Sequence, residues 1–360
     1  MRNTPRTTSP IRRLRALLGA ATAIAVGAAL AATVAATPAA AATSSPWLKP
    51  VLGGLLDRQH EPDQAFRGVV DGYVVEVAWA DLQPVANGPL AANNEIDQAV
   101  ANARAKGLKL KLRVFAGTSA PDWAKRLDGS PIQVQDTYGR AGTIGRFWTA
   151  RFGQAYLQLQ RKLAARYDNA PEVLVTQVTR CTTIWSEPFL RQGRTPDSVQ
   201  ALLKAGYTAA LDEQCHREQV GAQKVWVHTR SGLSFNPYQR ILPDGTIKND
   251  TVFTEQMMDY CRAQLGPRCV LENHSIREVQ DQGPSYDRLY SFLDARGGPI
   301  AFQTAAPERV GDLDTTLRWA VQHGAANVEL PTSYRTTASP ASMLTINRDL
   351  IANAQAATGS

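Results

Sequence analysis

The sequence has few residues of the kinds that build metal or nucleophile sites. Its 360 residues include four cysteines and five histidines. No C-x2-C pair and no histidine set at ligand spacing occurs, as a structural zinc site would require. A G-x-S-x-G elbow, a P-loop, a G-x-G-x-x-G turn after a strand and an H-E-x-x-H helix are also absent. We therefore exclude serine-hydrolase, nucleotide-binding and zincin classes, and expect no cofactor and no metal.

A basic surface is also lacking once the amino-terminal segment is set aside. The formal charge is +7, but residues 1–42 hold five arginines and no acidic residue, so residues 43–360 carry 7 − 5 = +2. A nucleic-acid-binding chain would keep a basic patch or stripe. We expect no nucleic-acid partner.

The first 42 residues have the order of a signal peptide. After the arginines comes an apolar run, Ala16–Ala36, and then Pro38 and the small residues Ala39–Ala42. A basic region, an apolar region and an Ala-x-Ala site are typical of secretory signals. We expect secretion, cleavage near Ala42 and no stable membrane association afterwards. An uncleaved anchor is the alternative, and Arg12-Arg13 leaves a twin-arginine route open.

The four cysteines predict two disulfides. An even number of cysteines in an exported chain favours disulfides over thiol chemistry. Cys261 and Cys269 bracket a short turn, Gln264–Pro267, so we pair them, which leaves Cys181 with Cys215. The sequence alone permits three pairings.

Residues 43–360 read as an α/β chain, a single-domain (β/α)8 TIM barrel. Short β-rich apolar runs alternate with longer amphipathic ones, which is typical of βα units. The expected strands are Pro50–Leu55, Tyr73–Trp79, Leu108–Phe115, Val173–Thr179, Lys224–His228, Arg268–Leu271, Pro299–Gln303 and Asn327–Leu330. Later helices are expected at Asp197–Glu213, Thr254–Leu265, Tyr286–Ala295, Leu313–His323 and Ala341–Ala354. The segment Asp57–Asp71 is too short for a full crossover helix.

The loops that follow the strands carry the candidate site, because that face of such barrels holds the active residues. The irregular stretches Gly117–Gly142 and Ser231–Asp250 both follow strands. Carboxylates, amides and aromatic side chains gather at the strand ends, which is the composition that holds sugars. The expected substrate-binding residues are Trp79, Arg113, Trp185, Asn273, Gln303 and Tyr334. Core packing is the alternative for each aromatic residue.

Two motifs resemble those of clan A glycoside hydrolases, the group of cellulases and β-galactosidases. Val75–Pro84, VEVAWADLQP, is similar to their second strand, and Trp185-Ser186-Glu187-Pro188 resembles the Asn-Glu-Pro after their fourth strand. The resemblance implies that Glu187 is the general acid/base. Ser186 replaces the family's asparagine, whose amide contacts the sugar. Pairing with Arg191 is the structural alternative for Glu187.

The seventh strand departs from that family. Gln303 stands where the resemblance places the nucleophilic glutamate, and an amide is no nucleophile. A two-carboxylate mechanism then needs another acid. We favour Glu329, alone at the tip of an apolar strand, with Glu272 as the alternative carboxylate. An ion pair with Arg230 or Arg335 is the other interpretation of Glu329.

The sequence thus predicts a secreted glycoside hydrolase acting on a poly- or oligosaccharide, with Glu187 and Glu329 as catalytic residues. The alternative is a secreted carbohydrate-binding barrel without catalysis, which Gln303 favours. A polysaccharide lyase is a third class, and it would need a Tyr, His or Lys base.

Overall fold

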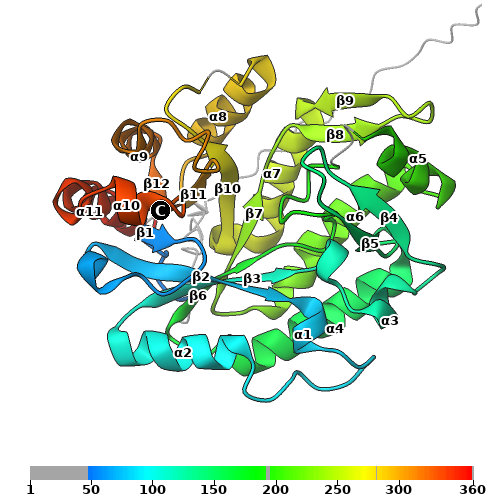
Figure 1. Cartoon of the computed structure of the whole chain (residues 1–360), viewed down its shortest axis with the longest axis horizontal. Helices are drawn as coiled ribbons and strands as arrows, with labels where there is room; N and C mark the ends of the chain where they lie inside the picture. Colours follow the sequence, from blue (N-terminus) through cyan, green and yellow to red (C-terminus); the bar gives the residue numbers. More distant parts are fainter. Residues whose placement is uncertain (1–47, 192–194, 281, 359–360) are drawn as a thin grey trace, which may run out of the picture. The chain divides into compact units, whose positions relative to one another are not determined.

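Eight parallel strands close into a barrel in the described part of the chain (Figure 1). The computed structural model describes residues 48–191, 195–280 and 282–358, so the predicted signal peptide lies outside it. In spatial order the barrel strands are β1 (Gly54–Asp57), β2 (Val70–Ala78), β3 (Lys109–Phe115), β6 (Val173–Gln177), β7 (Arg230–Ser234), β10 (Cys269–Ile276), β11 (Ile300–Thr304) and β12 (Ala325–Glu329). The predicted (β/α)8 barrel is confirmed.

Helices follow the strands and lie outside the barrel (Figure 1). The longer ones are α2 (Glu95–Lys106), α4 (Ala150–Tyr167), α5 (Pro196–Lys204), α6 (Ala209–Ala222), α7 (Thr251–Leu265), α8 (Pro284–Arg296), α9 (Leu313–Gln322) and α11 (Pro340–Ala356). Between β1 and β2 the described helical structure is the three-residue 3-10 helix η1 (Gln64–Phe66), as the short link predicted. The last helix, α11, contacts both β12 and β1 and so covers the closure of the barrel.

The strand predicted at Lys224–His228 is wrong, because β7 lies at Arg230–Ser234. The apolar residue that suggested a strand, Trp226, is instead buried outside the barrel sheet, where its indole donates to Gln160 Oε1 at 2.9 Å. The strand β7 is polar and faces a charged barrel interior. A search for apolar runs in the sequence therefore does not identify it.

The helix predicted at Asp197–Glu213 is two helices, α5 and α6. Gly206 between them has φ +89°, a left-handed conformation that ends a helix readily only at glycine. The Thr208 side chain then accepts from the Leu211 amide and caps the start of α6.

The two long irregular stretches each contain an antiparallel hairpin. Strands β4 (Ile132–Gln135) and β5 (Ala141–Ile144) pair after β3, and β8 (Tyr238–Ile241) pairs with β9 (Ile247–Asp250) after β7. Both hairpins stand on the face where the barrel strands end. They enlarge the wall around that face.

Strand β3 shows how the core is divided. Its apolar residues Leu110, Leu112 and Val114 belong to the cluster shared with helices α2 and α4. The intervening Lys111 and Arg113 are each 1% exposed and point to the other side, the barrel interior. The outer layer is therefore apolar, whereas the upper interior of the barrel holds charge.

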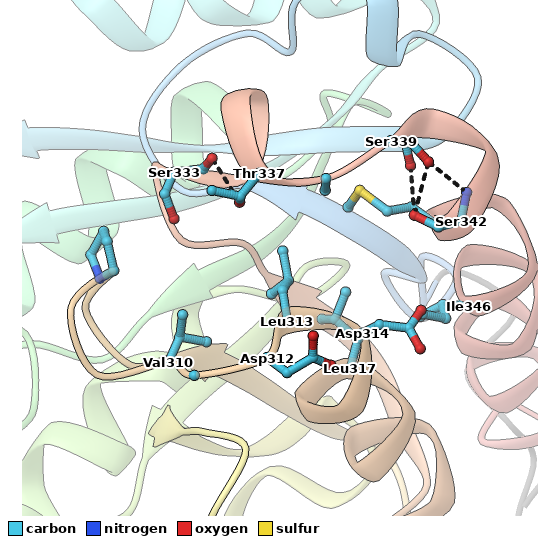
Figure 2. Close-up of a pocket in the computed structure, with 14 residues that line it drawn as sticks. Val310, Asp312, Leu313, Asp314, Leu317, Ser333, Thr337, Ser339, Ser342 and Ile346 are labelled. Carbon is cyan, nitrogen blue, oxygen red and sulfur yellow. Dashed lines mark hydrogen bonds between the residues drawn. The ribbon is translucent and has the colours of Figure 1, made fainter.

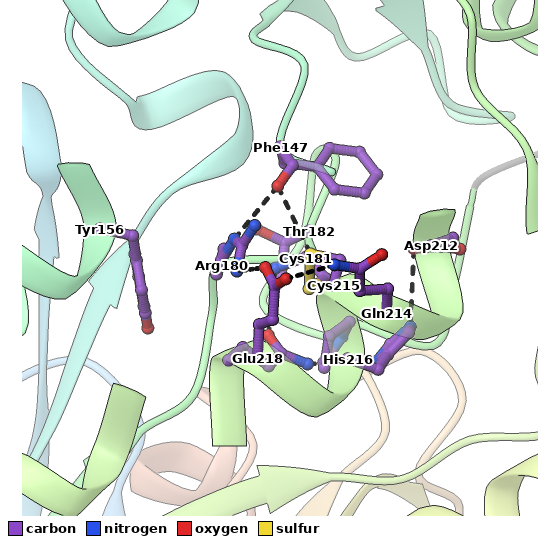
Figure 3. The surroundings of a disulfide bond; sticks show 12 residues. Phe147, Tyr156, Arg180, Cys181, Thr182, Asp212, Gln214, Cys215, His216 and Glu218 are labelled. Carbon is purple, nitrogen blue, oxygen red and sulfur yellow. Dashed lines mark hydrogen bonds and ion pairs between the residues drawn. A yellow bond between two sulfur atoms is a disulfide. The ribbon is translucent and has the colours of Figure 1, made fainter. Parts of the chain in front are cut away.

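Two disulfides join helices to neighbouring segments, and both predicted pairings are confirmed: Cys181–Cys215 and Cys261–Cys269. The first ties the loop after β6 to helix α6 (Figure 3), where Cys215 also contacts the Phe147 carbonyl. Disulfides are typical of proteins from oxidising compartments. Among the described residues, no helix has the length and apolarity needed to cross a membrane.

The two disulfides should contribute unequally to stability. Cys181–Cys215 closes a loop with a sequence separation of 34, against 8 for Cys261–Cys269. In the chain-entropy model the longer loop stabilises by about 4 kcal/mol and the shorter by about 2.5 kcal/mol. We expect the double alanine variant of Cys181 and Cys215 to unfold at the lower denaturant concentration. A larger loss on removing the short loop would contradict this expectation.

Candidate functional site

A cleft of about 360 Å³ opens where the barrel strands end. Its walls come from the loops after the first, third, fourth, fifth, sixth and seventh barrel strands. The lining side chains with chemical capability are Arg58, Asp136, Tyr138, Trp185, Glu187, Asn236, Gln239, His274, Arg277, Tyr286, Gln303, Thr304 and Arg309. This position is the active face of such barrels.

The loop that carries Glu187 is fixed by a buried ion pair between Arg191 and Asp212. Arg191 donates to both carboxylate oxygens of Asp212, at 2.8 and 2.6 Å, and to the Cys181 carbonyl at 3.1 Å. Tyr238 adds a hydrogen bond to Asp212 at 2.8 Å. Arg191 is thus committed to Asp212. The alternative in which Glu187 pairs with Arg191 is wrong.

The loop that carries Glu187 also contacts the loop after β3 through their backbones. The Thr118 amide donates to the Thr183 carbonyl at 2.9 Å. Gly117, at φ +52°, makes room, because a Cβ there would lie 2.0 Å from the Thr183 oxygen. The loops after β3 and β6 therefore meet beside the cleft, and Glu187 is presented on a braced segment.

Glu187 faces His274, which extends from β10 into the cleft. Their closest atoms, Glu187 Oε1 and His274 Nδ1, are 3.4 Å apart. The other ring nitrogen, Nε2, lies 3.0 Å from Glu272 Oε2. An imidazolium can donate to both carboxylates, whereas the neutral ring can donate to one. Glu272 therefore orients the ring that Glu187 meets.

Below His274 the chain of charges continues through Lys111. Its ammonium lies 2.7 Å from both Glu272 Oε2 and Glu329 Oε1. Arg113 then donates to both oxygens of Glu329, at 2.6 and 2.7 Å, and to Glu76 at 2.8 Å. The series runs without a break from the cleft to β2.

A glycine makes space for this arrangement. A Cβ at position 232 on β7 would lie 2.0 Å from Glu272 Oε1. Any other residue there would displace the carboxylate that bridges His274 and Lys111. Gly232 thus belongs to the site although it carries no side chain.

The surrounding charges keep the three acids ionised. Burial would raise the pKa of Glu187, but the imidazole of His274 and then the charge of Arg113 outweigh it and hold that pKa below its usual value. Burial acts likewise on Glu272 and is outweighed by Lys111 and then His274, so the Glu272 pKa is also lowered. For Glu329, Arg113 and Lys111 overcome burial and lower its pKa strongly.

Glu272, His274 and Glu329 could also be viewed as metal ligands, since one donor atom of each lies within 4.8 Å of the others. The Lys111 ammonium, however, already binds both carboxylates. A cation in this place would have to displace a buried positive charge. We assign no metal to the cluster.

The cleft brings together three of the predicted site residues: Glu187, Trp185 and Gln303. Trp185 donates through its indole to Asp136 at 3.1 Å. Gln303 lies on the seventh barrel strand, β11, so the residue opposite the Glu187 loop in the clan A pattern is indeed an amide. Its Oε1 atom is buried without a hydrogen-bond partner.

Four predicted substrate contacts do not line the cleft. Trp79 packs edge-on against Trp123 in the core, and Arg113 is bound to Glu329 and Glu76. Asn273 donates to the Phe235 carbonyl. These side chains are buried, so we give them structural roles.

Tyr334, the fourth of these, donates to Asp57 at 2.7 Å and is also buried. Arg335 pairs with the same aspartate. Arg230 starts β7 and donates to the Pro267 carbonyl, at the opposite end of the strands. The ion-pair interpretation of Glu329 is therefore correct in kind, but the partners are Lys111 and Arg113.

Sequence reasoning missed the cationic side chains of the cleft. Arg58 directly follows β1, and Arg277 directly follows β10. The rule that residues after strands form the site would have selected both. Placing the first strand's end at Leu55 and the sixth strand's end at Leu271 hid them.

A second hollow, of about 520 Å³, lies beside α9, the short helix α10 (Tyr334–Thr337) and α11 (Figure 2). Hydroxyls and apolar side chains line it. Its two carboxylates are engaged: Asp312 caps the Thr315 amide, and Asp314 pairs with Arg318. We do not place the chemistry there, because the hollow lacks a titratable pair facing open space.

Comparisons with known proteins found similar solved structures at low sequence identity. No protein-family model matches the chain, and no curated protein matches it either. Similar solved structures include a β-galactosidase from the psychrophilic Marinomonas ef1, at 15% identity and a TM-score of 0.47 over 84% of this chain and 59% of that one. An endo-glycoceramidase II from Rhodococcus sp. aligns at 16% identity and 0.44, over 80% and 75% of the chains.

A morphinone reductase bound to tetrahydroNAD aligns equally well, at 17% identity and a TM-score of 0.46 over 81% of this chain and 90% of that one. The activity has to be argued from the site itself.

Removing Lys111 should destabilise the protein strongly at neutral pH. Lys111→Met leaves Glu272 and Glu329 buried with less compensation, which costs about 3–5 kcal/mol. Because both carboxylates have lowered pKa values, their contribution is present above the unfolded pKa of about 4.3 and is lost as pH falls below it. The loss caused by the variant should therefore shrink in acid.

Denaturant unfolding at pH 7 and pH 4 measures this dependence. Lys204→Met, on the exposed end of α5, serves as the matched control and should cost little at either pH. An equal loss at both pH values for Lys111→Met would refute the charge-based explanation.

His274→Gln should raise the pKa of Glu187, because burial would no longer be opposed by the imidazole. Carbon-13 carboxyl titration by NMR would follow the change. His323→Gln removes an imidazole that pairs with Asp294 on the surface and should leave Glu187 unaffected. An unchanged Glu187 pKa in His274→Gln would show that the cleft imidazole does not control it.

Proposed function

We propose that the protein is a secreted glycoside hydrolase that holds a poly- or oligosaccharide in the cleft. The observation that carries the proposal is the pair of Glu187 and His274, set at the ends of the fourth and sixth barrel strands beside Trp185 and Gln303. The aromatic ring supplies a face for a sugar, and the amides supply donors and acceptors. The predicted signal peptide and the two disulfides support secretion.

Glu187 is the catalytic acid/base in this proposal. Its carboxyl donates a proton to the leaving glycosidic oxygen as the C–O bond breaks, and the resulting carboxylate takes a proton from the attacking water. The pKa of Glu187 is lowered in the free protein by His274 and Arg113, so the carboxyl must take up a proton before it can donate one in the first step. Glu272 is a positioning residue that orients the imidazole.

Glu329, which the sequence suggested as the second catalytic carboxylate, does not act as the nucleophile in this proposal. Both oxygens of Glu329 accept from Arg113, one also accepts from Lys111, and the side chain is fully buried. Glu272 is also buried, and its Oε2 accepts from Lys111 while its Oε1 has no hydrogen-bond partner. We propose that both set the charge of the cleft rather than contact the sugar.

A second candidate function is glycan binding without hydrolysis. Gln303 favours it, because an amide occupies the seventh-strand position and cannot serve as a nucleophile. The two candidates differ in whether purified protein releases reducing sugar.

Glu187→Gln should abolish hydrolysis and leave glycan binding intact. Loss of proton transfer from a positioned acid lowers the rate by about 10²–10⁴-fold. Reducing-sugar release from a panel of plant and microbial polysaccharides and aryl glycosides measures the effect, and calorimetry measures binding. Glu95→Gln, at an exposed position of α2, is the matched control.

Wild-type release that persists in Glu187→Gln would rule out this residue as the acid. Binding by the wild type with no release on any substrate would replace the hydrolase with the glycan-binding candidate.

A further inference from the structure

The cleft is more basic than the chain around it. Residues 43–360 carry a formal charge of only +2. The described lining nevertheless includes three arginines, Arg58, Arg277 and Arg309, against two carboxylates, Asp136 and Glu187. Local concentration of one sign of charge in a concave site attracts ligands of the opposite sign.

Both cleft carboxylates are already engaged within the protein. Asp136 accepts from the Trp185 indole at 3.1 Å and from the backbone amides of Tyr138 and Arg140, each at 2.9 Å. Glu187 faces His274. Neither acid lies within 4.0 Å of Arg58 or Arg277, although Glu187 acts on the charge of Arg58 from a greater distance.

Arg58 and Arg277 make hydrogen bonds to neutral groups. Arg58 donates to the Thr304 carbonyl and, at 2.8 Å, to its hydroxyl, while its buried Nε has no hydrogen-bond partner. Arg277 donates to Gln282 Oε1 at 2.8 Å and to the Ser275 carbonyl at 3.3 Å. Within the described ranges, neither guanidinium has a carboxylate within 4.0 Å.

Arg309 extends the same pattern to the rim. Its side chain is 48% exposed, and the nearest carboxylate, on Glu308, is 4.0 Å away. An exposed contact of that length contributes little. The rim thus offers a third guanidinium to a ligand.

Partly buried guanidinium groups such as those of Arg58 and Arg277 are stabilised by a counter-charge, and the planar Arg fork matches a carboxylate or a sulfate. We propose that the cleft binds an acidic saccharide, whose anionic substituent lies between Arg58 and Arg277 while Glu187 faces a neighbouring glycosidic bond. This proposal names the substrate class of the function proposed above and rests on the same cleft. Uronate carboxylates and sugar sulfates share the required chemistry.

Calorimetry on the mature protein tests the proposal with matched ligands. One arm uses oligosaccharides of galacturonate, glucuronate or mannuronate, each beside its methyl ester, which keeps the sugar and removes the charge. The other arm uses sulfated galactan oligosaccharides beside their desulfated forms. We expect at least one acid form to bind about tenfold or more tightly than its neutral counterpart, because a hydrogen bond to a charged group contributes that much.

Arg277→Gln and Arg58→Gln should each weaken binding of the acid form by about ten- to hundredfold and leave the neutral form nearly unchanged. Arg288→Gln, which removes a surface arginine of α8 that pairs with Glu255, should leave both affinities unchanged. Circular dichroism confirms that each variant is folded. If Arg58→Gln fails to fold, Arg277→Gln alone decides.

Reducing-sugar release on the same ligands separates this proposal from the proposed activity. If acid forms bind more tightly but no reducing sugar is released, the substrate class is supported and the proposed hydrolase activity is rejected. Release from neutral glycans with no preference for any acid form would overturn the substrate class and leave the hydrolase standing. Absence of binding to every acid form would also overturn it.

Discussion

The lysine ammonium buried between Glu272 and Glu329 is the interaction on which the site depends. Lys111 and the two glutamates are all at most 1% exposed, so each charge is tolerable only because the others are present. Lys111 thereby fixes Glu272, Glu272 fixes the ring of His274, and His274 faces Glu187. Lys111 therefore sets the orientation of the proposed catalytic acid through Glu272 and His274.

The same network determines what chemistry the cleft can perform. A general acid normally needs a raised pKa, which burial alone would give Glu187. His274 and Arg113 produce the opposite result and lower the pKa of Glu187, so the carboxyl must take up a proton before it can act as an acid. Phe189, close to Glu187 in the sequence, packs with Phe235 and His216 in the core.

The barrel could be predicted because its outer layer is apolar, and the interior network could not, because patterning interprets charge as exposure. β3 contains the signal in its alternation, with Lys111 and Arg113 between Leu110, Leu112 and Val114. This pattern has two interpretations. The cations either face solvent on one side of the strand or face a charged barrel interior. Only the parallel neighbours on both sides of β3 decide for the interior.

The candidate site divides in a similar way. Trp185, Glu187 and Gln303 follow or end strands whose positions were clear, and all three reach the cleft. Trp79 and Tyr334 also follow strands, but their side chains pack against Trp123 and Phe66. The spacing of residues in the sequence does not show this orientation.

The departures from the clan A pattern are consistent with one another. An amide at the seventh strand removes a negative charge from the cleft, and the arginines after β1 and β10 add positive charge there. A carboxylate at the position of Gln303 would repel an acidic sugar, whereas the Gln303 amide can donate a hydrogen bond to it. The amide of Gln303 and the guanidinium groups without an ion-pair partner thus change the cleft in the same direction, towards an anionic ligand.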